Sequence, residues 1–218
     1  MTEQNEQITI AMAKGRLAEQ TMELMEGMGI DVSPLREKSR KLVFESADGK
    51  YRYIMVKPSD VPTYVDHGVA DVGIVGKDTL MEENRPLYEM LDLGFGKCSI
   101  CVCGYAKQEP LKKAHIRVAT KYTGIAGQVF ATRGSSIEII KLNGSVELGQ
   151  VIGLSDVILD IVESGATLKA NGLSVIEEIC TGEQRLVVNR VSLKTKEKSI
   201  RPLIDGLRKQ IEMRKDEA

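Results

Sequence analysis

The sequence predicts an α/β protein of two lobes with a central cleft. Short apolar segments rich in β-branched residues alternate along the chain with segments of helical periodicity. Two apolar stretches, residues 91–105 and 185–191, connect two such alternating units, so that the second unit is inserted into the first. Two crossings of this kind imply two lobes joined by a hinge. We therefore expect a first lobe from residues 1–96 and 188–218, and a second lobe from residues 97–187.

Composition restricts the classes of partner. The chain has 218 residues, of which 42% are hydrophobic and 28% charged, as in globular proteins of one or two domains. The net charge of −1 gives no general attraction to nucleic acid or to anionic membranes, so we expect neither as a partner. No apolar run reaches transmembrane length, and the first residues are polar and acidic. We expect a cytoplasmic protein.

The elements of the first lobe follow from local signals. We expect its strands and helices over residues 9–13, 17–28, 42–44, 51–56, 59–66, 70–75 and 77–83. Gly29 is a stop for the first helix, and Asp48-Gly49 is a hairpin signal between two strands. Ser59 is the expected N-cap of the next helix, because Pro62 suits a first helical turn.

The second lobe continues the alternation. We expect its strands over residues 97–105, 116–119, 137–142, 157–162 and 173–179, with helices that begin near Thr123, Ser145 and Thr167. The fourth of these strands is apolar except for Asp160, which is typical of a strand buried in a parallel sheet. A final amphipathic helix over residues 194–213 returns to the first lobe and carries Leu203, Leu207 and Ile211 on one face.

The four cysteines are better interpreted as reduced thiols than as a metal site. Cys98 lies on an expected strand and faces away from Cys101 and Cys103, because side chains alternate along a strand. The fourth cysteine, Cys180, is far from them in sequence, and no histidine lies nearby. We therefore expect no metal held by protein side chains alone.

A loop after the strand over residues 157–162 predicts an anion site. The loop consists of Glu163, Ser164, Gly165, Ala166, Thr167 and Leu168. Gly165 lets the backbone approach a phosphate, and Ser164 and Thr167 add hydroxyl donors to the free N–H groups of a helix N-terminus. The carboxylates of Asp160 and Glu163 suit ribose hydroxyls, which indicates a phosphoribosyl ligand. The alternative is a strand–turn–helix without a ligand.

Basic residues in the first lobe predict a second anion contact. Lys14 and Arg16 lie where a helix begins, and cations there oppose the helix dipole at a cost of about 0.3–1 kcal/mol each. An anion that docks between them would explain their placement. Arg40, between Ser39 and Lys41, adds a second basic cluster. The alternative is a set of solvated charges on surface turns.

The residues from 147 to 168 resemble the signature of ATP phosphoribosyltransferases, the enzymes that begin histidine biosynthesis. The matching positions are Glu147, Gly153, Asp160, Ser164, Gly165, Thr167 and Leu168. Residues 11–17, 39–44, 58–65, 73–78 and 119–122 resemble further blocks of this family, in the same order. The resemblance implies a fold similar to that of type II periplasmic binding proteins, with the site in the cleft.

The implied reaction joins the phosphoribosyl group of 5-phosphoribosyl 1-pyrophosphate to N1 of the adenine of ATP and releases pyrophosphate. Adenine N1 carries no proton, so the attack needs no general base. The implied catalytic residues are Arg16 and Arg40, assisted by Lys14, because fixed cations stabilise the leaving pyrophosphate. Mg²⁺ would bind mainly through the oxygens of that pyrophosphate.

The resemblance and the loop chemistry together assign the substrate contacts. Residues 164–168 would hold the 5′-phosphate, and Glu163 and Asp160 the ribose hydroxyls. The candidate substrate-binding residues are Glu147, Asp160, Glu163, Ser164, Gly165, Ala166, Thr167 and Leu168. Two other functions stay open: a non-catalytic nucleotide or solute-binding module of the same fold, and a phosphoribosyltransferase that uses another base.

The resemblance is to the short form of the family, which implies partners. Such chains form homodimers and assemble with a regulatory subunit that resembles the catalytic domain of histidyl-tRNA synthetase. The apolar face of the last expected helix, with Leu203, Leu207 and Ile211, would support such association or would pack on the first lobe.

Overall fold

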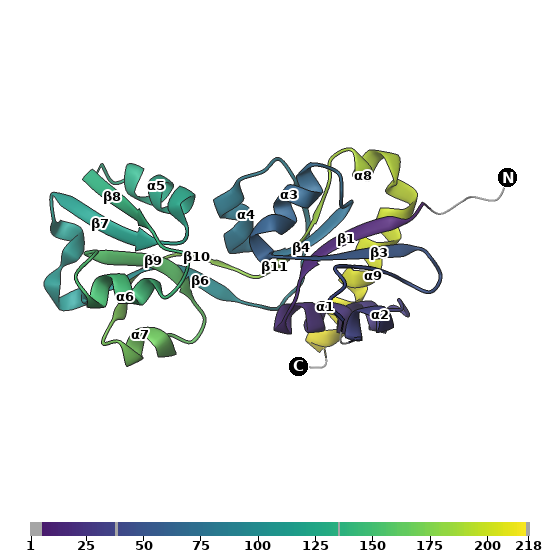
Figure 1. Ribbon diagram of the computed structural model, residues 1–218, viewed down its shortest axis with the longest axis horizontal. Helices are drawn as coiled ribbons and strands as arrows, with labels where there is room; N and C mark the ends of the chain where they lie inside the picture. The colour runs from purple at the N-terminus through teal and green to yellow at the C-terminus, as the bar shows by residue number, and fades with distance from the viewer. Residues whose placement is uncertain (1–5, 38, 135, 217–218) are drawn as a thin grey trace. The chain divides into compact units, whose positions relative to one another are not determined.

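The computed structural model describes residues 6–37, 39–134 and 136–216 of the chain (Figure 1). It divides into two compact units, one formed by Met1–Gly96 with Glu183–Ala218 and the other by Lys97–Gly182. The prediction of two α/β lobes is confirmed. The chain returns to the first unit at Glu183, whereas the sequence placed the boundary at residue 188. The reason is that residues 184–188 pair with strands of the first sheet.

The first unit surrounds one mixed sheet. Its elements are β1 (Ile8–Ala13), α1 (Arg16–Gly27), α2 (Ser33–Arg36), β2 (Val43–Glu45), β3 (Tyr51–Val56), the 3₁₀ turn η1 (Pro58–Asp60), α3 (Val61–Asp66), β4 (Val72–Gly76), α4 (Lys77–Glu83), β5 (Tyr88–Asp92), β11 (Gln184–Val188), α8 (Ser192–Thr195) and α9 (Glu197–Asp216). The strand order is β2-β3-β1-β4-β11-β5, in which β3, β1 and β4 are parallel. The carboxyl ends of these three strands therefore lie at one edge of the sheet.

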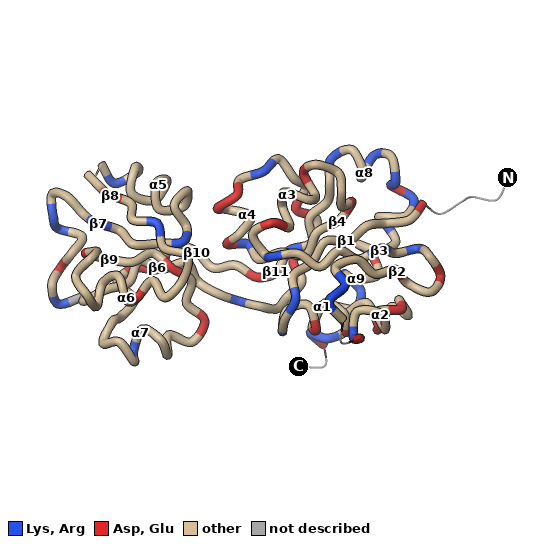
Figure 2. The backbone as a smooth tube through the Cα atoms, viewed as in Figure 1, with Lys and Arg blue, Asp and Glu red and all other residues tan. Residues whose placement is uncertain are grey.

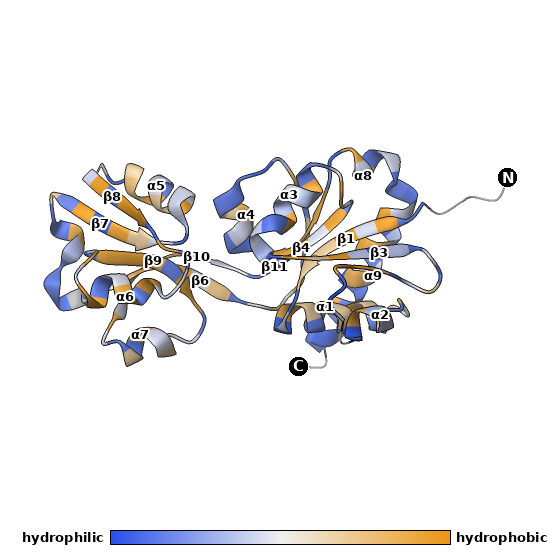
Figure 3. Ribbon diagram, in the orientation of Figure 1, coloured by the Kyte–Doolittle hydropathy of each residue, from blue (hydrophilic) through white to orange (hydrophobic). Residues whose placement is uncertain are grey.

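Helices cover both faces of this sheet. Apolar residues of α1 and α9 pack with one face in the main core of the unit, and those of α3 pack with the other face. Figure 3 shows hydrophobic residues along the strands, and all five residues of β4 are buried, as expected for a strand that is covered on both faces. Leu203, Leu207 and Ile211 are buried in the main core, so this face of α9 packs within the first unit and offers no surface for another chain.

Two local expectations for the first unit were wrong. Ser59 is not an N-cap: it lies inside η1, and Asp60 stands at the N-cap of α3 without a capping side-chain bond. The final helix is two helices, α8 and α9, because the chain turns at Lys196 before α9 begins. The strand β5 was also not expected; it precedes Gly94 and Gly96, whose positive φ angles of 74° and 68° separate it from the crossing into the second unit.

The second unit surrounds a smaller mixed sheet. Its elements are β6 (Cys98–Gly104), two 3₁₀ turns η2 (Ala106–Gln108) and η3 (Pro110–Lys112), β7 (His115–Thr120), α5 (Thr123–Ala131), β8 (Ser136–Lys141), α6 (Val146–Val151), β9 (Val157–Val162), α7 (Ala166–Ala170) and β10 (Ser174–Gly182). The strand order is β10-β6-β9-β7-β8, in which β9, β7 and β8 are parallel and β6 is antiparallel to β9. The helices α6 and α7 share a core cluster with one face of the sheet, which contains Cys101 and Cys103.

Charged groups are distributed without a block of one sign. Figure 2 shows Lys and Arg interspersed with Asp and Glu along both units. Cys98 is partly exposed at the start of β6, whereas Cys101 and Cys103 are buried, and all four cysteines are free thiols. Across the described residues, no helix combines the length and apolar character needed to cross a bilayer.

Candidate functional site

A cavity opens in the second unit where β9 ends. Its volume is about 310 Å³. The lining residues are Glu147, Asp160, Ile161, Val162, Glu163, Ser164, Gly165, Ala166, Thr167 and Leu168. All eight residues that the sequence predicts for substrate binding therefore border one cavity, although Glu147 comes from α6 and the others from β9 and the segment after it.

The cavity lies at the point of an α/β sheet where ligands usually bind. From β7 the chain passes through α5 to β8 on one side, and it then returns through α6 to β9 on the other side of β7. The loops that follow β7 and β9 thus diverge at neighbouring carboxyl ends. Such a reversal of strand order leaves a crevice outside the sheet that can accept a ligand.

The turn after β9 is built around Gly165. This residue has a φ angle of 71°, a left-handed conformation that most side chains disfavour, and it stands at the N-cap of α7. Ser164 Oγ accepts a hydrogen bond from Ala166 N at 3.4 Å, and Gly165 O accepts one from Lys169 N at 3.0 Å. Because α7 has five residues, its dipole is small, so the loop must attract anions mainly through N–H and hydroxyl groups.

Acidic residues also line the cavity. Asp160 pairs in register with Cys101, and Ile158 with Cys103, which places Asp160 on the sheet face that α6 and α7 cover. Burial raises the pKa of Cys103 to about 12, with smaller contributions from nearby groups that include Asp160 and Glu147. The two carboxylates therefore flank the same buried face of the sheet.

The cavity suits ligand groups that donate hydrogen bonds better than it suits anionic groups. It contains the carboxylates of Glu147, Asp160 and Glu163, and among its lining residues there is no lysine or arginine. Carboxylates accept hydrogen bonds from sugar hydroxyls, whereas they repel phosphate oxygens. A phosphorylated sugar would thus present its hydroxyls to the carboxylates and its phosphate to the loop at residues 164–168.

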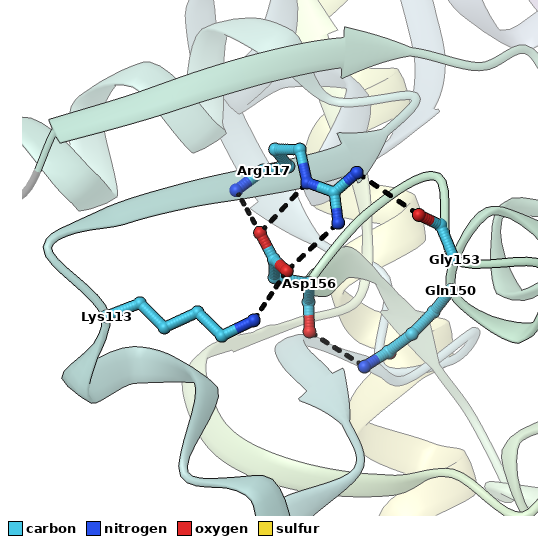
Figure 4. Close-up of polar contacts among 5 residues, drawn as sticks. All are labelled: Lys113, Arg117, Gln150, Gly153 and Asp156. Atoms are coloured by element: carbon cyan, nitrogen blue, oxygen red, sulfur yellow. Dashed lines mark hydrogen bonds and ion pairs between the residues drawn. The ribbon is translucent and has the colours of Figure 1, made fainter.

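A polar cluster fixes the other end of β9 (Figure 4). The Asp156 carboxylate accepts hydrogen bonds from the backbone and guanidinium of Arg117 and from Lys113 Nζ, the last at 2.7 Å. Arg117 also donates to Gly153 O at 3.1 Å, and Gln150 donates to Asp156 O at 2.8 Å. The guanidinium and ammonium groups hold the pKa of Asp156 well below its usual range. The cluster joins β7, the end of α6 and the start of β9, at the end of β9 opposite to the cavity.

The three predicted catalytic cations all lie at one edge of the first sheet. Lys14 and Arg16 are exposed and flank Gly15, the N-cap of α1, directly after β1. Arg40 is exposed and precedes β2. Ala13 is in register with Val56, and Leu42 O accepts a hydrogen bond from Met55 N, so the start of β2 lies beside the carboxyl ends of β1 and β3. The structure brings these cations to one edge of the first unit, and the cavity belongs to the second unit.

The fold places the chain in a broad class: two-lobed α/β proteins of the periplasmic-binding-protein type. A histidine kinase sensor domain with similarity to periplasmic binding proteins superposes with a TM-score of 0.60 at 12% identity, over 97% of this chain and 92% of the other. The aliphatic sulphonate binding protein SsuA of Escherichia coli gives the same TM-score and identity, over 97% of this chain and 75% of its own. At this identity, the likeness concerns the fold alone.

Sequence comparisons identify the family within this class. The family model HisG, described as ATP phosphoribosyltransferase, matches residues 57–209. The ATP phosphoribosyltransferase of Lachnospira eligens is 52% identical over 94% of this chain and 97% of its own length, and that of Alkaliphilus metalliredigens is 54% identical over 92% and 96%. The chain belongs to the ATP phosphoribosyltransferase family, as the resemblance at residues 147–168 predicted.

A solved structure of the same family supports this assignment. The ATP phosphoribosyl transferase (HisG:HisZ) complex from Thermotoga maritima contains a chain that superposes with a TM-score of 0.84 at 34% identity. The superposition covers 94% of this chain and 99% of that chain. The likeness therefore extends over both units.

Proposed function

We propose that this chain transfers the phosphoribosyl group of 5-phosphoribosyl 1-pyrophosphate to N1 of the adenine of ATP, the first step of histidine biosynthesis. The observation that carries the proposal is the cavity after β9, which gathers all eight predicted substrate-binding residues in a chain of this family. A non-catalytic binding module of the same fold is not favoured, because the relatives that match over nearly the whole chain are transferases.

In this proposal, the cavity holds the phosphoribosyl group. The N–H groups of the turn at Gly165 and the hydroxyls of Ser164 and Thr167 donate to the 5′-phosphate, supported by the neighbouring Ala166 and Leu168. Asp160 and Glu163 accept hydrogen bonds from the ribose hydroxyls, and Glu147 closes the acidic side of the cavity. The acidic lining repels the pyrophosphate, so the leaving group points away from this wall.

The chemistry needs stabilisation of the leaving group more than proton transfer. Adenine N1 attacks with a free lone pair, and cleavage of the C1–O bond moves negative charge onto the pyrophosphate. Fixed cations aimed at that charge lower the barrier without reorganisation. Arg16 and Arg40 are suited to this role, and Lys14 assists, because all three are exposed cations at one carboxyl edge of the first sheet.

Magnesium would be bound mainly by the substrate and only to a small extent by the protein. Mg²⁺ in such enzymes is commonly bound through one or two carboxylates together with substrate phosphates. Among the described residues, no group of three or more His, Cys, Asp or Glu side chains could hold a metal alone. The magnesium ion would therefore take most of its ligands from the pyrophosphate oxygens and from water.

We also propose that this chain works within a larger assembly in the cytoplasm. A related chain of similar length is part of a HisG:HisZ complex. We propose that this chain also assembles with a separate regulatory subunit. From the family resemblance, we further propose that this subunit resembles histidyl-tRNA synthetase and that the chain forms a homodimer. Both substrates are intracellular metabolites, so the assembly would work in the cytoplasm.

Formation of phosphoribosyl-ATP tests the proposed function. The purified chain, with any partner that it requires, is mixed with ATP, 5-phosphoribosyl 1-pyrophosphate and magnesium, and product absorbance is followed. We expect magnesium-dependent turnover, and loss of 5-phosphoribosyl 1-pyrophosphate binding in Gly165→Val, because a side chain with a φ of 71° is strained and crowds the phosphate. Substrate binding without turnover in the complete mixture would favour a binding module instead.

A melting curve accompanies the Gly165→Val titration. A Cβ atom at this position would meet only Val162, at the ordinary contact distance of 3.8 Å, so the cost to the fold comes from the strained φ angle. We expect a lower melting temperature but a folded variant at the temperature of the titration. Retained micromolar affinity for 5-phosphoribosyl 1-pyrophosphate in a folded variant would move the 5′-phosphate to another site.

A further inference from the structure

A buried hydroxyl joins β9, the strand that borders the cavity, to its neighbour β7. Thr120, the last residue of β7, is 0% exposed. Its Oγ1 donates a hydrogen bond to Leu159 O at 2.6 Å and accepts one from Tyr122 N at 2.8 Å. Its own carbonyl accepts a hydrogen bond from Leu142 N at 3.0 Å. One residue therefore contacts β9, the start of α5 and the residue after β8.

The hydroxyl acts where the regular sheet ends. Thr120 and Leu159 form the last pair in the register between β7 and β9, after which β7 leaves the sheet toward α5. The Leu159 carbonyl belongs to the peptide group whose nitrogen is that of Asp160. Because a peptide group is planar and rigid, a hydrogen bond to this carbonyl fixes the backbone from which the Asp160 side chain projects.

We infer that Thr120 is a positioning residue for the sugar site. By holding the peptide group before Asp160, it sets where the Asp160 carboxylate meets the ribose hydroxyls. By accepting from Tyr122 N, it also fixes the loop after β7 that borders the same reversal of strand order. This inference rests on the proposed function, in which Asp160 contacts the ribose.

The chemistry of threonine separates positioning from packing. Valine has nearly the same shape but cannot donate or accept, so Thr120→Val leaves Leu159 O and Tyr122 N without the hydroxyl in a buried region. The peptide group would then turn toward another partner. Thr120→Ser keeps the hydroxyl and loses a buried methyl group, so it disturbs packing and preserves the hydrogen bonds.

Steady-state kinetics of the full chain, with any partner that it requires, test the inference. We expect Thr120→Val to raise the KM for 5-phosphoribosyl 1-pyrophosphate about tenfold, with kcat and the KM for ATP changed less than about twofold. Thr120→Ser should restore this KM even though its melting temperature falls. Ser192→Ala is the matched control: it removes a buried hydroxyl that donates to Asp71 at 2.7 Å in the first unit, and should lower stability without changing the KM.

The Asp160→Asn variant separates the inference from the proposed function. If Asp160→Asn raises the KM for 5-phosphoribosyl 1-pyrophosphate and Thr120→Val does not, Thr120 has no positioning role and the proposed function stands. If Asp160→Asn leaves this KM unchanged, the ribose contact is wrong and the inference fails with it. Equal effects of Thr120→Val and Thr120→Ser on the KM would show a packing role and would also overturn the inference.

Discussion

Arg16 occupies a position in α1 that folding alone does not favour. It is the first residue of the helix, after an N-cap, Gly15, that provides no capping side chain. A cation at this end opposes the helix dipole, which costs about 0.3–1 kcal/mol. In the proposed reaction, the negative charge that develops on the pyrophosphate would be stabilised by this cation.

At this scale we expect Arg16→Ala and Arg40→Ala to reduce turnover much more than they weaken ATP binding. Removal of one preorganised donor to developing charge typically lowers the rate about 10²–10³-fold. Turnover under saturating substrate and calorimetric ATP titration measure the two effects.

Arg36→Ala is the control for these variants. Arg36 is an exposed arginine of the same unit whose guanidinium pairs with Glu19 and Glu26 at 2.9 Å, so its loss should leave turnover nearly unchanged. Near-normal turnover in Arg16→Ala or Arg40→Ala would exclude that residue as a contact of the leaving group.

At the scale of elements, the start of β9 depends on one carboxylate. The Asp156 carboxylate forms ion pairs with Lys113 and Arg117 and accepts a hydrogen bond from the backbone N–H of Arg117 in β7. Its side chain is 10% exposed. Hydrogen bonds that involve charged groups contribute more than neutral ones, typically about 1.5–3 kcal/mol. The cluster therefore holds β9 against β7 at the end of the strand opposite to the cavity.

We expect Asp156→Ala to lower the free energy of unfolding by about 2 kcal/mol near neutral pH. The pKa of Asp156 is lowered in the folded state, so its contribution is present above the pKa of an unfolded aspartate, about 4, and is lost as the pH falls through the lower folded value. The difference in the free energy of unfolding between wild type and Asp156→Ala should therefore become smaller at acidic pH.

Urea unfolding at pH 7 and near pH 3 measures this difference. Lys112→Ala is the control, because it removes an exposed pair with Glu109 and should change stability by less than about 1 kcal/mol. A difference between wild type and Asp156→Ala that stays constant with pH would contradict the role of the ionised carboxylate.

Local signals in the sequence predicted most elements and the loop at the cavity. Strand β9 has the predicted bounds, because a β-branched apolar run followed by small residues and Gly165 carries its own start and stop. Ser59 shows where local signals fail: Pro58 begins a 3₁₀ turn that moves the start of α3 beyond it. Asp156 and Thr120 could not be predicted, since each acts on a strand 39 residues away in sequence.

At the scale of the whole molecule, the proposed assembly assigns regulation to a second chain. In the proposed assembly, the regulatory subunit senses histidine and this chain performs the chemistry. We expect the isolated chain to form dimers and to be insensitive to histidine, with inhibition appearing when the regulatory subunit is added. Activity against histidine concentration, with and without that subunit, and light scattering for mass measure both expectations. Strong inhibition of the isolated chain would place a histidine site within these residues.

The insertion of one unit into the other determines the order in which they can be completed during synthesis. Strand β11 lies between β4 and β5, and α9 supplies buried residues to the main core of the first unit. Helix α9 must therefore leave the ribosome before the core of the first unit can be completed. Residues Lys97–Gly182, by contrast, emerge earlier as one continuous segment. The later-made unit can thus fold earlier, which reverses the usual N-terminal-first order. Until β11 is inserted, the edges of β4 and β5 that it will pair with stay exposed. Exposed strand edges promote aggregation, so we expect a chaperone to protect this part of the nascent chain.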